Sequence, residues 1–122
     1  MSPGAAPGKP APGAEALILV LTTLPDRAAA EALARELLGA RLAACIHVGA
    51  TVQSLYHWND QVETAEETQL LIKTRRSAYP QLEAAILARH PYELPEIVVV
   101  PISHGLPAYL DWIVDATEPP AA

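Results

Sequence analysis

Residues 43–58 read AACIHVGATVQSLYHW and alternate between two kinds of side chain almost without interruption. One set of alternate positions is mainly apolar or aromatic: Ala44, Ile46, Val48, Ala50, Val52, Tyr56 and Trp58, with Ser54 as the exception. The other set is mixed: Cys45, His47, Gly49, Thr51, Gln53, Leu55 and His57. A period of two is typical of a half-buried β-strand, because successive side chains point to opposite faces of a sheet. The stretch therefore predicts one strand of unusual length.

A second long strand is predicted over residues 61–75 (QVETAEETQLLIKTR), returning beside the first. Asn59 and Asp60 supply the turn, since both residue types tolerate positive φ. Leu70 and Ile72 share one face near the end of this strand. Its middle is acidic, and glutamate is a weak strand former, so we expect a bulge or break there. The residues concerned, interpreted as a solvated charge run, are Glu63, Glu66 and Glu67.

The segment before this hairpin predicts a buried strand followed by an amphipathic helix. Residues 16–23 (ALILVLTT) form the apolar run of the strand. Asp26 is suited to cap the start of the helix, and Gly39 to end it. Glu31 and Arg35 are spaced as an i,i+4 ion pair on the exposed face. Helical spacing predicts a buried side made of Ala30, Leu33, Ala34 and Leu37.

The segment after the hairpin predicts a second helix, a short strand and a third helix. Ser77 is suited to cap the second helix, Pro80 to its first turn, and the helix should stop at His90. Residues 97–102 hold a β-branched run that predicts a buried strand. Pro107 opens the third helix, whose buried side is expected to be Leu110, Ile113 and Val114.

The resulting order, β-α-β-β-α-β-α, predicts an α+β protein with a ferredoxin-like sandwich, in which helices cover one face of an antiparallel sheet. The hairpin strands are longer than such a sheet needs. Exposed, apolar, extended strands pair readily with other chains. We therefore expect self-association through the long hairpin.

Composition limits the partners and the cellular location that are expected for this chain. The chain has 122 residues, a formal net charge of −6 and one cysteine, so no internal disulfide is expected. Residues 1–15 are rich in Pro, Gly and Ala and are expected to be a disordered tail, with a short second tail at 118–122 and one domain over 16–117. The acidic balance argues against nucleic acid as a partner. No apolar run suits a membrane span or secretory signal, so a cytoplasmic protein is the expectation.

Residues 89–101 (RHPYELPEIVVVP) place polar side chains directly before the strand predicted at residues 97–102. Pro91 and Pro95 restrict the backbone around Tyr92, Glu93 and Glu96, so these side chains have less entropy to lose on binding. A helix end leading into a strand is a usual place for a pocket. The segment therefore predicts a binding site.

Several separate blocks of this sequence, in order and spacing, resemble the CutA divalent-cation tolerance proteins: TTLPD (22–26), RLAAC (41–45), SLYHWNDQVE (54–63), LLIKTR (70–75), HPYELPEI (90–97) and YLDWI (109–113). The resemblance extends over residues 17–113. It implies a ferredoxin-like protomer, a homotrimer joined through edge strands, and a cytoplasmic location in bacteria. It also implies a link to tolerance of divalent metals and to copper binding. The family is similar in fold to the trimeric PII-type signalling proteins.

The resemblance also bears on the metal candidates. Some members carry Cys at the position of Thr22 and a second His at that of Arg89, and a soft thiolate, unlike a hydroxyl, favours Cu(I). A copper site at those positions would keep only His90, whose alternative role is a favourable interaction with a helix dipole. His104 and Cys45 are the further candidates, the alternatives being a solvated loop histidine and a small apolar core residue.

A cleft between protomers is the hypothesis that unites these residues. Its predicted lining is Trp58, Lys73, His90, Tyr92, Glu93 and Glu96. Tyr56 and Trp58 are assigned to the trimer interface, so part of the lining would come from a neighbouring subunit. In the alternative interpretation, Tyr92 and Glu96 only fasten the interface through hydrogen bonds, and Lys73 pairs with a glutamate.

The functional expectation is a cytoplasmic homotrimer that binds a divalent metal, copper above all, and supports metal tolerance without catalysis. No organic cofactor is expected. No nucleophile elbow or phosphate loop is present in the sequence, so the chain is not expected to be an enzyme. Two alternatives stay open: a PII-like regulatory module that binds a small anionic ligand between subunits, and a trimeric scaffold for a partner protein.

Overall fold

The structure is a computed structural model that describes residues 9–10 and 16–119. Its elements confirm the predicted order and add two very short strands and a 3-10 turn. In chain order they are β1 (Lys9–Pro10), β2 (Leu17–Leu24), α1 (Arg27–Gly39), β3 (Cys45–Trp58), β4 (Gln61–Arg75), η2 (Arg76–Ala78), α2 (Tyr79–Arg89), β5 (Val98–Ile102), β6 (His104–Gly105) and α3 (Pro107–Ala116).

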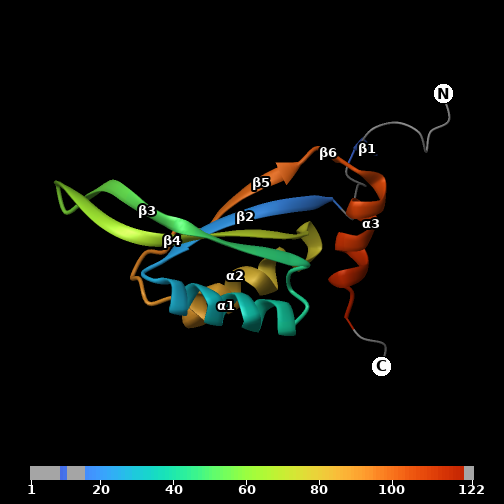
Figure 1. Ribbon diagram of the computed structural model, residues 1–122, viewed down its shortest axis with the longest axis horizontal. Helices are drawn as coiled ribbons and strands as arrows, with labels where there is room; N and C mark the ends of the chain where they lie inside the picture. Colours follow the sequence, from blue (N-terminus) through green and yellow to red (C-terminus); the bar gives the residue numbers. More distant parts are fainter. Residues whose placement is uncertain (1–8, 11–15, 120–122) are drawn as a thin grey trace.

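The main sheet is antiparallel, with the strand order β3-β4-β2-β5. Helices α1 and α2 lie together against one face, and α3 stands at the end of the sheet near the start of β2 (Figure 1). Neighbouring residues of β2 belong to two separate clusters. Ile18 packs in the core formed with α1 and α2, and Leu17 packs against Leu110 and Ile113 of α3. This arrangement confirms the α+β, ferredoxin-like prediction.

The core lies between the sheet and the first two helices. All four residues predicted for the buried side of α1 are buried, as are the apolar residues that face them from β2, β4 and α2. The central cluster includes Ile18, Val20, Leu24, Leu33, Leu37, Leu70, Ile72, Leu82 and Ile86. Complete burial of one such side chain stabilises a fold by about 1.5–3 kcal/mol. This cluster therefore stabilises the packing of the sheet against α1 and α2, from which the hairpin extends.

The helix ends match the sequence predictions only in part. Asp26 caps α1, accepting a hydrogen bond from the Ala29 N–H at 2.8 Å. Helix α1 ends at Gly39 as expected, but the left-handed residue is Arg41, with φ of 59°. The predicted cap at Ser77 is wrong. That residue lies inside the η2 turn, which leads into α2 without a side-chain cap, because the chain is already turning before the helix begins.

The irregularity in the hairpin lies in β3, so its predicted position in β4 is wrong. Val48 pairs with Leu70, whereas Thr51 pairs with Thr68, so β3 holds one extra residue. Gly49 explains the location: a Cβ there would come within 3.1 Å of the Gln69 carbonyl oxygen, so only glycine lets the strands approach freely.

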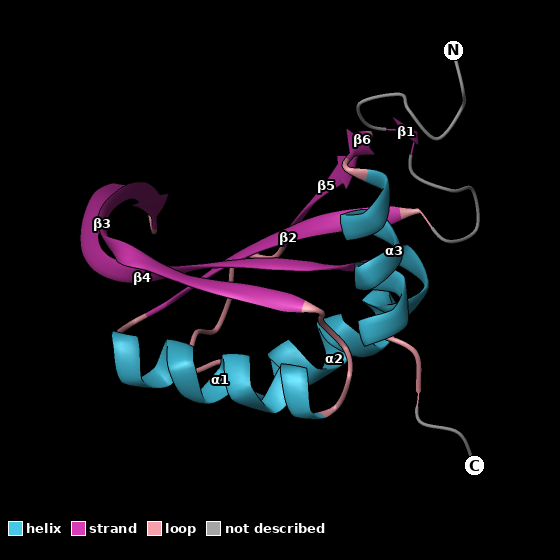
Figure 2. Cartoon of the chain, turned by 45° about the vertical axis from the view of Figure 1, so that its right-hand side comes forward, coloured by secondary structure: helices cyan, strands magenta, loops and turns pink. Residues whose placement is uncertain are grey.

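The bulge exchanges the two faces of β3 along its length. Ile46 lies opposite Ile72, on the face covered by the helices, but Val52 lies opposite Glu67, which is on the other face of β4. The prediction that residues 44 to 58 keep one apolar face is therefore wrong. Beyond the bulge, Tyr56 and Trp58 belong to the face away from α1 and α2, and Figure 2 shows this outer part of the hairpin curling back on itself.

Apolar side chains remain exposed on β5 and on the outer hairpin. The expectation of a buried strand at residues 97–102 is wrong for this protomer, because β5 is an edge strand. Val98, Val99 and Val100 are 49%, 38% and 43% exposed. Leu55 and Val62 near the hairpin tip are each 65% exposed, and the hairpin extends well past the helices (Figure 1).

The two predicted tails lie mostly outside the described residues. Residues 1–8, 11–15 and 120–122 are not described. Between them, Lys9 and Pro10 form β1, which runs antiparallel to β6 with Lys9 opposite Gly105 and Pro10 opposite His104.

Candidate binding cleft

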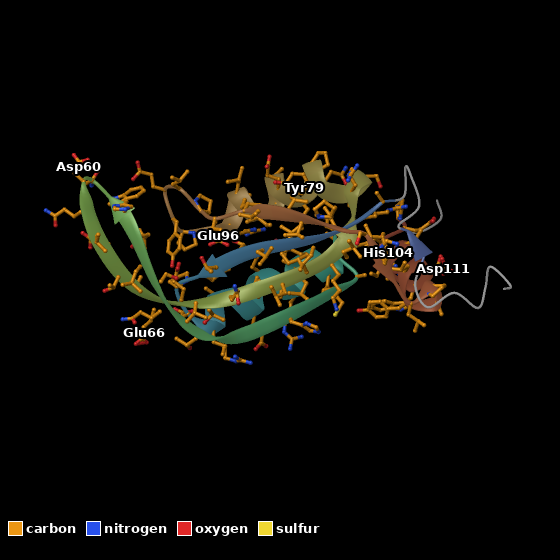
Figure 3. The ribbon with its side chains drawn as sticks, turned by 90° about the horizontal axis from the view of Figure 1, so that it is seen from above. Asp60, Glu66, Tyr79, Glu96, His104 and Asp111 are labelled. Atoms are coloured by element: carbon orange, nitrogen blue, oxygen red, sulfur yellow. The ribbon has the colours of Figure 1, made fainter. Side chains whose placement is uncertain are left out.

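A cavity of about 880 Å³ lies between the outer hairpin and the loop that joins α2 to β5. Figure 3 shows the two sides: Asp60 marks the far end of the hairpin, and Glu96 lies back toward the body of the protein. The cavity is of the size that small-molecule sites usually have. Its lining residues are Thr23, Ser54, Leu55, Tyr56, His57, Trp58, Ala65, Glu67, Pro91, Tyr92, Glu93, Leu94, Pro95 and Glu96.

The bulge in β3 helps to place this cleft. Because one residue is added at Val48–Thr51, the side chains of Ser54, Tyr56 and Trp58 share the face of Glu67. The opposite wall is residues 91–96, held between the C-terminus of α2 and the start of β5 by two prolines that limit its conformations.

Glu67 is the central polar group of the cleft. The residue is only 8% exposed, and its carboxylate accepts a hydrogen bond from the Thr23 hydroxyl at 3.1 Å. Burial alone would raise the pKa of Glu67, but hydrogen bonds from Ser54, Tyr92 and Thr23 and the nearby His90 outweigh it and lower this pKa below its ordinary value. Glu67 is therefore a buried anion held by neutral hydroxyl groups.

Tyr92 is one of the hydrogen-bond donors to Glu67, and its own pKa is shifted in the opposite direction. Burial, together with the hydrogen bond to Glu67 and the negative charge of that carboxylate, raises the pKa of the Tyr92 phenol well above its ordinary value. The phenol therefore stays protonated and donates to Glu67. Its ring lies 4.7 Å from the ring of His90, centroid to centroid.

Both ring nitrogens of His90 are engaged within the protein. Nε2 lies 2.7 Å from the Thr23 carbonyl oxygen, and Nδ1 accepts a hydrogen bond from the Tyr92 N–H at 3.2 Å. A carbonyl oxygen only accepts, so Nε2 carries the proton and Nδ1 is the acceptor. With neither nitrogen open, His90 orients the 90–96 loop and is poorly placed to bind a metal ion.

Within one protomer, the structure brings together most of the residues predicted to line a cleft between subunits, and Lys73 is the exception. Trp58, Tyr92, Glu93 and Glu96 line the cavity, and His90 supports it from behind. Lys73 does not belong to the lining. Its amine bonds to the Tyr109 hydroxyl at 3.3 Å and lies 5.2 Å from the centre of that ring, because its place in β4 is opposite Leu19 and Cys45, toward α3.

The other metal candidates do not gather in one place. Cys45 is half-buried in β3 beside Lys73, and His104 lies in β6, with Nδ1 3.3 Å from the Ser103 hydroxyl. Arg89, which replaces a possible second histidine, forms an ion pair with Glu36 of α1. Among residues 9–10 and 16–119, no group of three His, Cys, Asp or Glu side chains is arranged to hold a metal ion.

Four polar residues of the cleft were not predicted from the sequence: Thr23, Ser54, His57 and Glu67. Glu67 was interpreted as solvated because it stands in an acidic run, and no local pattern separates it from Glu63 and Glu66. One signal was available for Ser54. It interrupts an apolar series, and a polar residue at such a position often has a buried partner.

The charge of the lining is of one sign. Three carboxylates, from Glu67, Glu93 and Glu96, contribute to the described lining, and no lysine or arginine does. An exposed histidine, His57, also borders the cavity. The cleft is therefore electrostatically suited to a cation.

The sequence as a whole matches one protein family. The CutA1 divalent ion tolerance protein family profile matches residues 18–116, almost all of the described chain. The chain belongs to the CutA1 divalent ion tolerance protein family. This confirms the resemblance drawn from the sequence blocks.

Relatives within the CutA1 family agree in sequence and structure. The divalent-cation tolerance protein CutA of Thermus thermophilus is 40% identical over 99 residues, which are 81% of this chain and 96% of that protein. A CutA1 crystal structure from Oryza sativa has a TM-score of 0.82 at 35% identity, covering 84% of this chain and 94% of the other. A structure described as the periplasmic CutA of Archaeoglobus fulgidus has a TM-score of 0.81 at 32% identity, covering 84% and 99%.

Two further observations concern the cellular setting of the family. The rice relative named Protein CutA 1, chloroplastic, is 36% identical over 100 residues, and the match spans 56% of its length. Family members are thus described as chloroplastic and as periplasmic. In the part of this chain that the structure describes, no helix is long and apolar enough to cross a membrane.

Proposed function

We propose that the chain is a non-catalytic, cytoplasmic homotrimer that binds a divalent cation, Cu²⁺ in the first place, in the cleft between the hairpin and the 91–96 loop, and thereby supports metal tolerance. Membership of the CutA1 family supports the general role. The observation that carries the proposal is the charge of the cleft, whose described lining has three carboxylates and neither lysine nor arginine.

The same observation disfavours the regulatory alternative. A PII-like module that binds a small anion needs donors such as Arg or Lys, or helix N-termini, aimed at its ligand. The predicted cationic member of the cleft, Lys73, bonds to Tyr109 outside it. An anion entering the cleft would instead meet Glu67, Glu93 and Glu96.

The nature of the donors favours Cu²⁺ over Cu⁺. His57, Glu93 and Glu96 line the cleft and are exposed, so their nitrogen and oxygen atoms are accessible to an ion. Imidazole and carboxylate suit Cu²⁺, whereas Cu⁺ prefers thiolate. Cys45, the one cysteine, is half-buried beside Lys73 and does not line the cleft.

A second protomer is needed to complete the ligand set, because one protomer offers no group of three donors within its described residues. The exposed apolar residues support such an assembly. Val98–Val100 lie on a sheet edge, and Leu55 and Val62 lie on a hairpin that extends past its own core. A trimer in which each hairpin covers a neighbour would bury both surfaces.

Calorimetric titration with Cu²⁺ tests the proposal. We expect saturable binding by the wild type, and a loss of affinity of about tenfold or more in His57→Ala and in a Glu93→Gln/Glu96→Gln double variant. His104→Ala is the matched control, since His104 lies in β6 and outside the cleft lining, and it should bind like the wild type. Absence of Cu²⁺ binding, or unchanged affinity in both cleft variants, would contradict the proposal.

A further inference from the structure

The cleft has more room than a metal ion uses. Its volume of about 880 Å³ lies in the range of sites for small organic molecules, and the three donors proposed for Cu²⁺ are exposed at its rim. Behind them lies an inner part formed by Thr23, Ser54, Glu67 and Tyr92, which are buried or half-buried. This inner part is a separate chemical environment that the metal hypothesis leaves unused.

The inner part contains a carboxylate whose hydrogen bonds come only from neutral groups. The groups that donate to Glu67 are the hydroxyls of Thr23, Ser54 and Tyr92, all of them neutral. His90 is nearby and contributes to the lowered pKa of Glu67, but its two ring nitrogens contact the Thr23 carbonyl and the Tyr92 N–H, not the carboxylate. Among the described residues that line the cleft, no lysine or arginine balances the charge. A buried anion of this kind is stabilised further when a cation enters beside it.

The walls of the cleft add aromatic surface to this charge. Tyr56 and Trp58 line it from the hairpin, 42% and 38% exposed, and Tyr92 lines it from the loop. Aromatic faces attract organic cations and supply contact area to their alkyl groups, but they give no oxygen or nitrogen ligand to a divalent metal ion. The combination of a carboxylate with tryptophan and tyrosine therefore selects a different ligand class from the rim.

We propose that the inner part of the cleft binds a small organic cation, an alkylated ammonium group, with its positive charge toward Glu67 and its alkyl groups against Tyr56 and Trp58. The inference rests on the proposed function in one respect, namely that the cleft is a ligand site. It differs in the ligand and in the residues that bind it, so either proposal can be wrong while the other is right.

Ligand-observed NMR tests the inference on the full-length protein, with tetramethylammonium as the probe. Saturation transferred from the protein to the probe's methyl protons should be strong and should decline when excess tetraethylammonium competes. tert-Butanol, which is neutral and of similar size, should give a signal weaker by about fivefold or more. Equal signals from the two probes would overturn the inference, because charge would then play no part.

Two tryptophan variants locate the binding. Trp58→Leu should weaken tetramethylammonium binding by about fivefold, whereas Trp112→Leu, which removes a similarly exposed tryptophan on α3, should leave it unchanged. Glu67→Gln should weaken it by about tenfold. Because Glu67→Gln also disturbs a hydrogen-bond network, Trp58→Leu serves as the variant that leaves the carboxylate in place. Retained binding in Trp58→Leu would overturn the inference.

Parallel titration of the same samples with Cu²⁺ separates the two proposals. If tetramethylammonium fails to bind while Cu²⁺ binds, this inference is wrong while the proposed function stands. If tetramethylammonium binds and Cu²⁺ does not, the inference stands and the metal proposal is wrong. His57→Ala should affect Cu²⁺ alone.

Discussion

At the scale of single residues, Glu67 determines the character of the cleft. It is a carboxylate at 8% exposure whose negative charge is distributed among hydroxyl donors from β2, β3 and the 91–96 loop. Three segments distant in the sequence thus meet at one side chain. Its removal should loosen the loop and the hairpin together.

The first prediction concerns the stability that ionised Glu67 provides. Glu67→Gln should lower the free energy of unfolding by about 1–3 kcal/mol at pH 7, the usual cost of losing hydrogen bonds to a charged group. The folded-state pKa of Glu67 is lowered from an ordinary value of 4.5, so its stabilisation is fully present above about pH 4.5 and is lost as pH falls through the folded pKa.

Denaturant unfolding of wild type and Glu67→Gln at a fixed protomer concentration measures this effect between pH 7 and pH 3. The difference in unfolding free energy should shrink as the pH falls below 4.5. Glu63→Gln, an exposed neighbour in β4, is the control and should change little. A difference between wild type and Glu67→Gln that stays constant over this range would show that the charge of Glu67 is not the stabilising feature.

Single residues were also where prediction from the sequence failed most. The motif 90–97 indicated Tyr92, Glu93 and Glu96 because prolines mark a restricted segment, and all three residues line the cavity. Glu67 and His57 were not found, since their surroundings come from pairing between distant segments. Lys73 was assigned to the cleft because it lies near the end of the returning hairpin strand, but strand register places its amine beside Tyr109.

At the scale of elements, one glycine in β3 sets the geometry of the hairpin. Gly49 lies in the bulge between Val48 and Thr51, and that extra residue turns Tyr56 and Trp58 toward the cleft. The alternating pattern of residues 43–58 predicted the strand and its length. It could not show the change of face, because the alternation of apolar residues continues through the bulge.

The second prediction compares two glycine substitutions. Gly49→Ala should destabilise the protein by about 1 kcal/mol, because the new Cβ would approach the Gln69 carbonyl oxygen to 3.1 Å. Gly39→Ala, in the last turn of α1 with nothing within 4 Å of the new Cβ, should stabilise it by about 0.5 kcal/mol. Thermal or denaturant unfolding of both variants checks the pair, and equal effects would contradict the close-packed bulge.

The helices and the central strands could be predicted well, because the spacing of their apolar residues indicates directly which side is buried. Asp26, Pro80 and Pro107 mark helix starts by chemistry that is local to the backbone. The exposure of β5 could not be predicted, since a β-branched run predicts a strand but does not distinguish a central strand from an edge.

At the scale of the whole molecule, one protomer leaves many large apolar side chains exposed that its own core does not bury. Part of this surface lies in the outer hairpin and in β5, on opposite sides of the order β3-β4-β2-β5. Two different surfaces that complement each other produce a closed ring when the rotation between copies allows it. The proposed trimer is the ring that the family resemblance implies.

The third prediction tests the hairpin as the source of assembly. A Leu55→Asp/Val62→Asp double variant places two charges on side chains that are 65% exposed in one protomer, so an isolated chain should tolerate them. In a trimer these side chains would be buried, and the variant should dissociate and melt at a lower temperature. Leu87→Asp on α2, at 54% exposure, is the control and should remain assembled. Light scattering after size-exclusion chromatography measures the mass of the double variant and of the control.

Sedimentation equilibrium of the full chain at micromolar concentration tests most directly whether the cleft is completed by a second subunit. We expect a single species with three times the mass of one chain, across a tenfold dilution series. A stable monomer over that series would contradict the account, because the carboxylates and His57 of one protomer would then have no neighbour to complete a metal site.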